Sequence, residues 1–272
     1  MRSLVRRHQL ASFLILAFAL SWWPWPMTLM NKESVAMIPW GPAMAAMLVS
    51  WLALGGAGVR QLIGRLGQWR VGLRWYAAAF GIPLVTWGVA VVVAMAFLNS
   101  RMVATLTPVD LLIFPISFLT TALIKGPLTE EIGWRGFALP RMLEALRPLR
   151  ASLVLGLIWF SWHLPLLLTD PTRPALPFAL SVLAFSVILT WLHLATSGSL
   201  LIAVLFHAAV NTIASFVVPL FAPTDQLKVW WVFVAAMAAA ATTVARSRKF
   251  ADKDGEWALP RKTYRRQLAD QT

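Results

Sequence analysis

Residues 75–98 read WYAAAFGIPLVTWGVAVVVAMAFL, without a single charged side chain. The polar run Asn99-Ser100-Arg101 follows and ends the apolar stretch. A helix that crosses a lipid bilayer needs about 20 consecutive, mostly apolar residues. The stretch therefore predicts a membrane-spanning helix.

Further apolar stretches of similar length occur on both sides of it. We expect them to span the membrane at about 10–29, 35–54, 110–130, 151–168, 176–195, 199–221 and 227–245. The 272-residue chain is 59% hydrophobic and 13% charged, whereas soluble domains are about 45–50% apolar and 25% charged. We predict an all-α polytopic membrane protein with about eight transmembrane helices. Residues 1–245 form a single transmembrane domain in this interpretation, and residues 246–272 form a basic, polar cytosolic tail.

The basic residues indicate a topology and not a nucleic-acid partner. The chain has 24 Lys and Arg against 11 Asp and Glu, a net charge of +13. With both termini inside, 20 of the basic residues lie on the inner side. The outer segments hold the other four, which are Lys32, Arg101, Arg173 and Lys228. Cytoplasmic loops are enriched in Lys and Arg, and such loops contact anionic lipids. We expect a multi-pass cell-membrane protein with both termini cytoplasmic.

Three segments place polar groups inside predicted spans. Each such ionisable group costs about 2.5–3.5 kcal/mol on insertion scales, which makes it a functional hypothesis. The first segment holds Glu130, Glu131 and Arg135. Glu131 and Arg135 are spaced i, i+4 and can pair, so Glu130 points about 100° away and can face a cavity. An ordinary ion pair at a cytoplasmic helix end is the structural alternative.

The other two segments each contain a histidine. Trp159 precedes His163 by four residues, so its ring can buttress the imidazole, although a buried, hydrogen-bonded histidine is the structural alternative. His207 and Asn211 share one helix face, where interhelical hydrogen bonding is the alternative. At 1.5 Å per residue, Glu130, His163 and His207 lie roughly 17, 20 and 14 Å from the predicted inner ends of their helices. These similar depths predict one shared site.

This set of side chains suits the attack of water on a carbonyl group. A carboxylate and an imidazole can hold and deprotonate a water molecule, and an amide and a second imidazole can donate to a developing oxyanion. The same groups suit a divalent cation such as Zn²⁺, with Glu130, His163 and His207 as its ligands. The chain has no cysteine, which excludes a cysteine nucleophile and thiolate ligands, and it has no H-E-x-x-H motif. The residues leave open whether one cation or none takes part.

These motifs resemble those of the CPBP family, the CAAX proteases and bacteriocin-processing enzymes, also called the ABI family. Three motifs follow in that family's order and approximate spacing: E-E-x-x-x-R from Glu130 to Arg135, aromatic-x-x-x-H from Trp159 to His163, and H-x-x-x-N from His207 to Asn211. The resemblance covers a core at about residues 120–215. It implies an eight-helix intramembrane endopeptidase with a catalytic cavity.

The resemblance also implies roles for the main site residues. Glu130 would be the general base, and His163 would help to activate the water. His207 and Asn211 would stabilise the oxyanion. The substrate would be a peptide or a protein, with or without a lipid group, because the eukaryotic relatives act on prenylated C-terminal peptides.

The remaining predictions concern the residues that support the site and the alternative functions of the protein. Glu131 would support the site together with Arg135, and Trp159, where the family usually has phenylalanine, would buttress the imidazole of His163. A non-catalytic membrane immunity or scaffold protein is the first alternative. A proton-coupled transporter, in which Glu130 and His163 relay protons, is the second. It predicts inverted repeats, and we find none in the sequence.

Overall fold

The computed structural model describes residues 2–30, 37–170, 173–247 and 250. All the regular secondary structure in these ranges is helical, and the one additional pairing is an isolated β-bridge between Met102 and Phe221. The predicted all-α class is confirmed. The predicted tail lies outside the described residues at 248–249 and from residue 251 onward.

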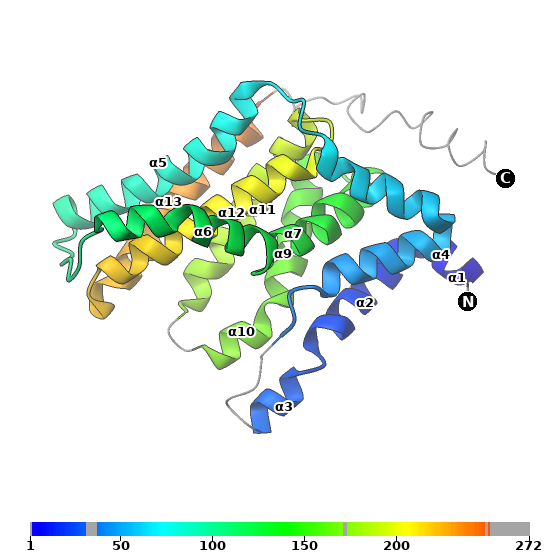
Figure 1. Ribbon diagram of the computed structural model, residues 1–272, viewed down its shortest axis with the longest axis horizontal. Coiled ribbons are helices and arrows are strands. Elements are labelled where there is room, and N and C mark those ends of the chain that lie inside the picture. The colour runs from blue at the N-terminus through cyan, green and yellow to red at the C-terminus, as the bar shows by residue number, and fades with distance from the viewer. Residues whose placement is uncertain (1, 31–36, 171–172, 248–249, 251–272) are drawn as a thin grey trace.

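Sixteen helical elements follow one another along the described chain (Figure 1). The first group contains α1 (Arg2–Arg7), α2 (Gln9–Trp22), α3 (Trp25–Met30), α4 (Gly41–Gly64), η1 (Arg65–Gly67) and α5 (Leu73–Phe97). The middle group contains α6 (Pro108–Leu123), α7 (Pro127–Glu131), η2 (Ile132–Ala138), α8 (Leu139–Leu143), α9 (Pro148–Trp162) and α10 (Leu164–Thr169). The last group contains α11 (Ala175–Ala195), α12 (Leu200–Val217), η3 (Val218–Leu220) and α13 (Pro223–Ala245).

We predicted about eight spans, and seven unbroken helical stretches of the described chain are long and apolar enough to cross a membrane. They are Gln9–Thr28, Gly41–Gly67, Leu73–Phe97, Pro108–Leu143, Ala175–Ala195, Leu200–Leu220 and Pro223–Ala245. The expected span at 151–168 is a shorter apolar helix of 15 residues, α9, followed by the six-residue α10. The interruption has a local cause, because Pro165 carries no N–H for the helical ladder.

A second predicted helix is also broken. The expected span at 110–130 ends as α6 at Leu123, and α7 starts only at Pro127. Between them Gly126 has φ of +123°, a backbone conformation that favours glycine. Proline suits the first turn of a helix, where its missing N–H is not needed. The Gly-Pro pair therefore stops one helix and starts the next directly before the two glutamates.

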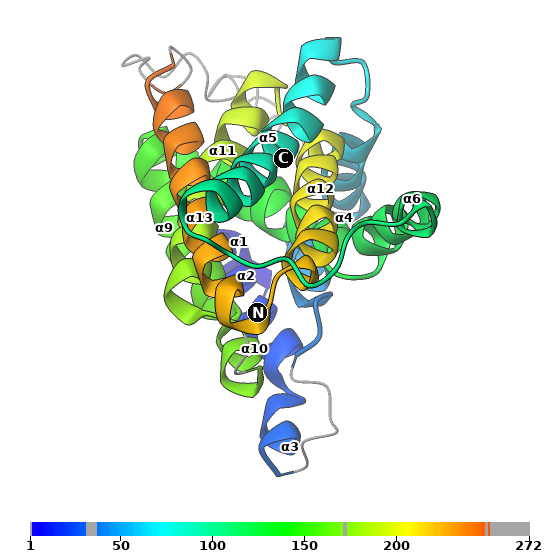
Figure 2. The ribbon, with the colours of Figure 1, turned by 90° about the vertical axis from the view of Figure 1, so that its left-hand side faces the viewer.

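The helices pack in two groups around the middle of the chain. Helix α2 packs on α4, whereas α11 packs on both α9 and α13, and α12 packs on both α5 and α6. Figure 2 shows α6 at one edge of the molecule, beside α12 and on the side away from α9. Leu112 and Ile116 of α6 are largely exposed. Apolar side chains on the outside are expected of a helix that faces lipid, because lipid tails are as apolar as leucine.

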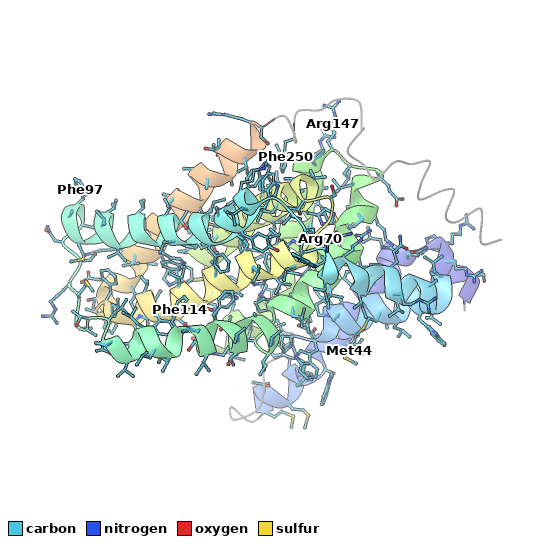
Figure 3. The ribbon with its side chains drawn as sticks, turned by 45° about the horizontal axis from the view of Figure 1, so that its top comes forward. Met44, Arg70, Phe97, Phe114, Arg147 and Phe250 are labelled. Atoms are coloured by element: carbon cyan, nitrogen blue, oxygen red, sulfur yellow. The ribbon has the colours of Figure 1, made fainter. Side chains whose placement is uncertain are left out.

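Helices α5 and α6 lie at the opposite end of the molecule from helix α4 (Figure 1). Figure 3 shows Phe97 and Phe114, of α5 and α6, in the half of the molecule opposite Met44 of α4. Inside the α5–α13 contact, Trp87 stacks on Phe233 with ring centroids 4.0 Å apart. Helices α7 and α9 pass between these two groups (Figure 1). The broken middle helices therefore bring their polar residues into the interior of the bundle.

Candidate active site

The two adjacent glutamates are buried at the start of the broken middle helix. Glu130 is 5% exposed and Glu131 is fully buried. The Glu130 backbone N–H donates to the Gly126 carbonyl at 2.8 Å. The Thr129 hydroxyl donates to the Pro39 carbonyl at 3.0 Å and so ties α7 to the segment before α4. A cytoplasmic surface ion pair, the structural alternative for this segment, would leave these side chains exposed.

Glu130 lies against α9, whose side chains approach one of its carboxylate oxygens. The Trp159 indole N–H donates to Glu130 Oε2 at 2.7 Å, and His163 Nε2 lies 3.9 Å from the same oxygen. His163 Nδ1 lies 2.7 Å from the Trp159 carbonyl oxygen. A carbonyl can only accept, so Nδ1 carries a proton, and Nε2 is an acceptor when the ring is neutral. With a neutral ring and an ionised Glu130, two acceptors face each other across 3.9 Å.

Glu131 pairs with two other residues. Its Oε1 accepts from Arg135 Nη1 at 3.1 Å and from His207 Nδ1 at 2.8 Å. The predicted pairing of Glu131 with Arg135 is confirmed, and both side chains are fully buried. The Arg135 guanidinium also lies over the Trp159 ring, 4.2 Å from its centroid. Arg135 and Trp159 therefore pack together between the two carboxylates.

The segment that carries Arg135 is a π-helix, η2. Its wider turn appears in the bond from the Leu139 N–H to the Trp134 carbonyl, five residues earlier. A neighbouring chain segment supports it, because Arg65 Nη1 donates to the Gly136 carbonyl at 3.2 Å. At Gly133 an added Cβ would lie 2.8 Å from the Pro42 carbonyl carbon. The close contact with α4 fixes η2 in place, and π-helical turns are frequent at functional sites.

Trp159 also connects the two histidines. Its ring centroid is 5.7 Å from that of His163 and 5.3 Å from that of His207. Phe185 of α11 stacks on Trp159 at 5.4 Å and meets His207 edge-on at 5.1 Å. Phe178 meets His163 edge-on at 5.2 Å. The predicted contact between Trp159 and His163 is present, and aromatic rings hold both imidazoles in fixed orientations.

Asn211 stands apart from this cluster. It lies one turn after His207 on α12, but its side chain is exposed. The hydrogen bonds of the described residues join His207 to Glu131 and leave Asn211 outside the network. Its role as an oxyanion donor stays a prediction.

Two features of the site had not been predicted. Sequence reasoning treated Trp159 as an apolar support and missed its N–H bond to Glu130. It also missed Gly126, where an added Cβ would collide with Glu130 Oε1. The Lys-Gly-Pro run directly before the glutamates was the available signal, because glycine followed by proline marks a turn.

The described residues do not assemble the metal site that was predicted from Glu130, His163 and His207. No three His, Cys, Asp or Glu side chains in the described ranges are grouped so that they could hold a metal ion. The expected ligands are divided between two clusters, because Glu130 faces His163 whereas His207 bonds to Glu131. In this arrangement Glu130, His163 and His207 do not form one ligand set.

Comparisons with known proteins identify the region that carries these residues. Residues 111–213 match the family model "Type II CAAX prenyl endopeptidase Rce1-like", and every predicted site residue falls in this range. The chain is also 29% identical over 151 residues to "CAAX prenyl protease 2" of the archaeon Methanococcus maripaludis. That match covers 52% of this chain and 53% of the relative, so the chain spans about half the length of the curated protein that it matches. The predicted resemblance is therefore confirmed: the chain is an integral membrane protein, and its residues 111–213 are similar to the type II CAAX prenyl endopeptidases.

Proposed function

We propose that the protein is an intramembrane endopeptidase in which Glu130 and His163 activate a water molecule. The observation that carries the proposal is the 3.9 Å separation of Glu130 Oε2 and His163 Nε2. With a neutral ring and an ionised Glu130, both atoms are acceptors, so a direct hydrogen bond between them is excluded, whereas a single water can donate one proton to each. The 5% exposure of Glu130 keeps bulk water away from this position.

Glu130 is the general base of the proposed reaction. As the water oxygen attacks the carbonyl carbon of the peptide bond, Glu130 accepts one of its protons. It then passes this proton to the leaving nitrogen, so that water and peptide give a carboxylic acid and an amine. His163 accepts the second hydrogen bond of the water, so that a lone pair of the water oxygen points to the substrate. Such positioned acid–base groups contribute about 10²–10⁴-fold to rates.

His207 and Asn211 are the proposed oxyanion donors. Because His207 Nδ1 already donates to Glu131, an oxyanion would bind at Nε2. In this role the ring carries a proton on both nitrogens, and the Glu131 carboxylate at 2.8 Å is its counter-charge. Arg135 balances the charge of Glu131 from the other side at 3.1 Å. Fixed donors of this kind need no reorganisation during the reaction.

The proposed substrate is a peptide or protein segment near the cytoplasmic side of the cell membrane. The curated relative is named "CAAX prenyl protease 2", so a C-terminal peptide with a prenylated cysteine is the first substrate to test. The positive-inside distribution of basic residues supports cytoplasmic termini, and these residues would contact anionic lipids.

The test is cleavage of internally quenched peptides by detergent-purified protein. Each peptide of the library is made with and without a farnesylated cysteine, and products are identified by mass spectrometry. We expect wild type to cleave, and Glu130→Gln to lose at least about 100-fold in rate. The exposed Glu144→Gln is the matched control and retains activity. A parallel arm with a chelator reports whether a metal ion is required.

Retained cleavage by purified Glu130→Gln would overturn this mechanism. If Glu130→Gln cleaves nothing but restores the phenotype of a deletion strain, the scaffold alternative is favoured instead.

A further inference from the structure

The backbone around His163 departs from a continuous helix. In an α-helix the Leu166 N–H would donate to the Trp162 carbonyl, but here it donates to the His163 carbonyl at 3.0 Å. The His163 N–H in turn donates to Phe160, only three residues earlier, at 2.9 Å. With φ of −83° and ψ of −1°, His163 lies near the sparsely populated bridge region of backbone conformations.

The Trp162 carbonyl, released from the helical ladder by this break, has a donor from elsewhere in the chain. The indole Nε1 of Trp22 donates to it at 2.9 Å, across a sequence separation of 140 residues. A buried carbonyl without a partner is costly, so this bond stabilises the broken conformation against an unbroken helix. Trp22 is the last residue of α2, before the family-matched region 111–213.

Aromatic contacts hold both partners of this bond. Trp22 contacts Phe18 and Trp25, with centroids 5.0 and 5.7 Å apart. The Trp162 side chain is buried and meets the His163 ring edge-on at 4.8 Å. A movement of the Trp162 backbone would therefore be passed directly to the imidazole. The first transmembrane helix is in this way connected to the group that faces Glu130.

We propose that Trp22 is a positioning residue for the water-activating histidine. By holding the Trp162 carbonyl, it fixes the turn from which His163 Nε2 reaches to within 3.9 Å of Glu130. The inference rests on the proposed function, because it assigns Trp22 a role in the geometry of that same site. It gives the N-terminal helix a part in catalysis without contact with the substrate.

The test compares Trp22→Phe with Trp25→Phe. The Trp25 Nε1 is buried, and no described residue accepts a hydrogen bond from it. Both variants therefore lose an indole N–H and a similar volume, but Trp22→Phe alone loses the bond to Trp162. With the farnesylated quenched peptide we expect Trp22→Phe to lower kcat about tenfold at unchanged KM, since small misplacements of reacting groups are costly in rate. We expect Trp25→Phe to stay within about twofold of wild type, because it keeps an aromatic ring against Trp22 and leaves the turn at His163 intact.

A second measurement does not depend on cleavage. In protein with ¹⁵N-labelled histidine, the imidazole signal of His163 is assigned with His163→Gln. We expect this signal to shift or broaden in Trp22→Phe and to match wild type in Trp25→Phe. An unchanged His163 signal, or equal kcat values for the two variants, would overturn the inference. If wild type itself cleaves no peptide, the proposed function fails, whereas the His163 spectrum still decides the role of Trp22.

Discussion

Trp159 donates its indole N–H to Glu130 at 2.7 Å, and its backbone carbonyl accepts from His163 Nδ1 at the same distance. One residue of α9 thus orients both of the groups that face the proposed water. The side chain fixes the carboxylate, and the main chain fixes which nitrogen of the imidazole is protonated. A phenylalanine at this position could supply the second bond but not the first.

The first prediction concerns this indole N–H. Trp159→Phe keeps an aromatic ring beside His163 but removes the bond to Glu130. Hydrogen bonds to charged groups contribute about 1.5–3 kcal/mol, so we expect kcat to fall about 10- to 100-fold. Trp87→Phe is the control, because the buried Trp87 Nε1 has no acceptor among the described residues. A kcat for Trp159→Phe within about twofold of wild type would contradict the prediction.

The second prediction concerns the buried pair of Glu131 and Arg135. Removing one partner leaves an uncompensated buried charge, which costs about 3–5 kcal/mol. We expect Glu131→Gln and Arg135→Gln each to lower the free energy of unfolding by this amount. The double variant should lose less than the sum of the two single losses, because contacting residues are not additive.

Thermal unfolding in detergent, followed by intrinsic fluorescence, measures all three variants of this cycle. His207, which also bonds to Glu131, is kept intact throughout. Strictly additive losses would mean that the 3.1 Å contact contributes nothing to folding.

The third prediction concerns the turn before the glutamates. Gly126→Ala introduces a Cβ at φ of +123°, where it would collide with Glu130 Oε1. We expect a loss of about 1–3 kcal/mol from backbone strain, together with loss of cleavage, because Glu130 must move. Gly81→Ala is the matched control, since an added Cβ there has no atom of the described residues within 4 Å. An active Gly126→Ala protein would show that Glu130 is not held by this turn.

The fourth prediction separates stability from activity. Asp225 accepts from the Arg101 backbone N–H at 2.9 Å and from Lys228 Nζ at 2.7 Å, at the start of α13. Asp225→Asn weakens both charge-assisted bonds, and we expect unfolding to become easier by about 1–2 kcal/mol. Because these residues belong to neither carboxylate cluster, kcat at a permissive temperature should remain that of wild type. A lowered kcat with unchanged stability would be the contrary result.

The sequence predicted the parts of this protein that depend on local pattern. Long apolar stretches predicted the membrane helices, and the i, i+4 spacing of Glu131 and Arg135 predicted their pairing, which the 3.1 Å contact between their side chains confirms. The stretch predicted as one span at 151–168 is two helices, α9 and α10, because a hydropathy average does not register the break that Pro165 causes after His163.

The tertiary structure decided which polar side chains contact one another. The sequence alone grouped Glu130, Glu131, His163, His207 and Asn211 as one set, on the basis of their similar depth. Folding divides four of them into two pairs and leaves Asn211 exposed. Depth along a helix follows from counting residues, but the direction in which a side chain points depends on how each helix is rotated against its neighbours. The bond from Trp22 to Trp162, across 140 residues, arises only from that packing.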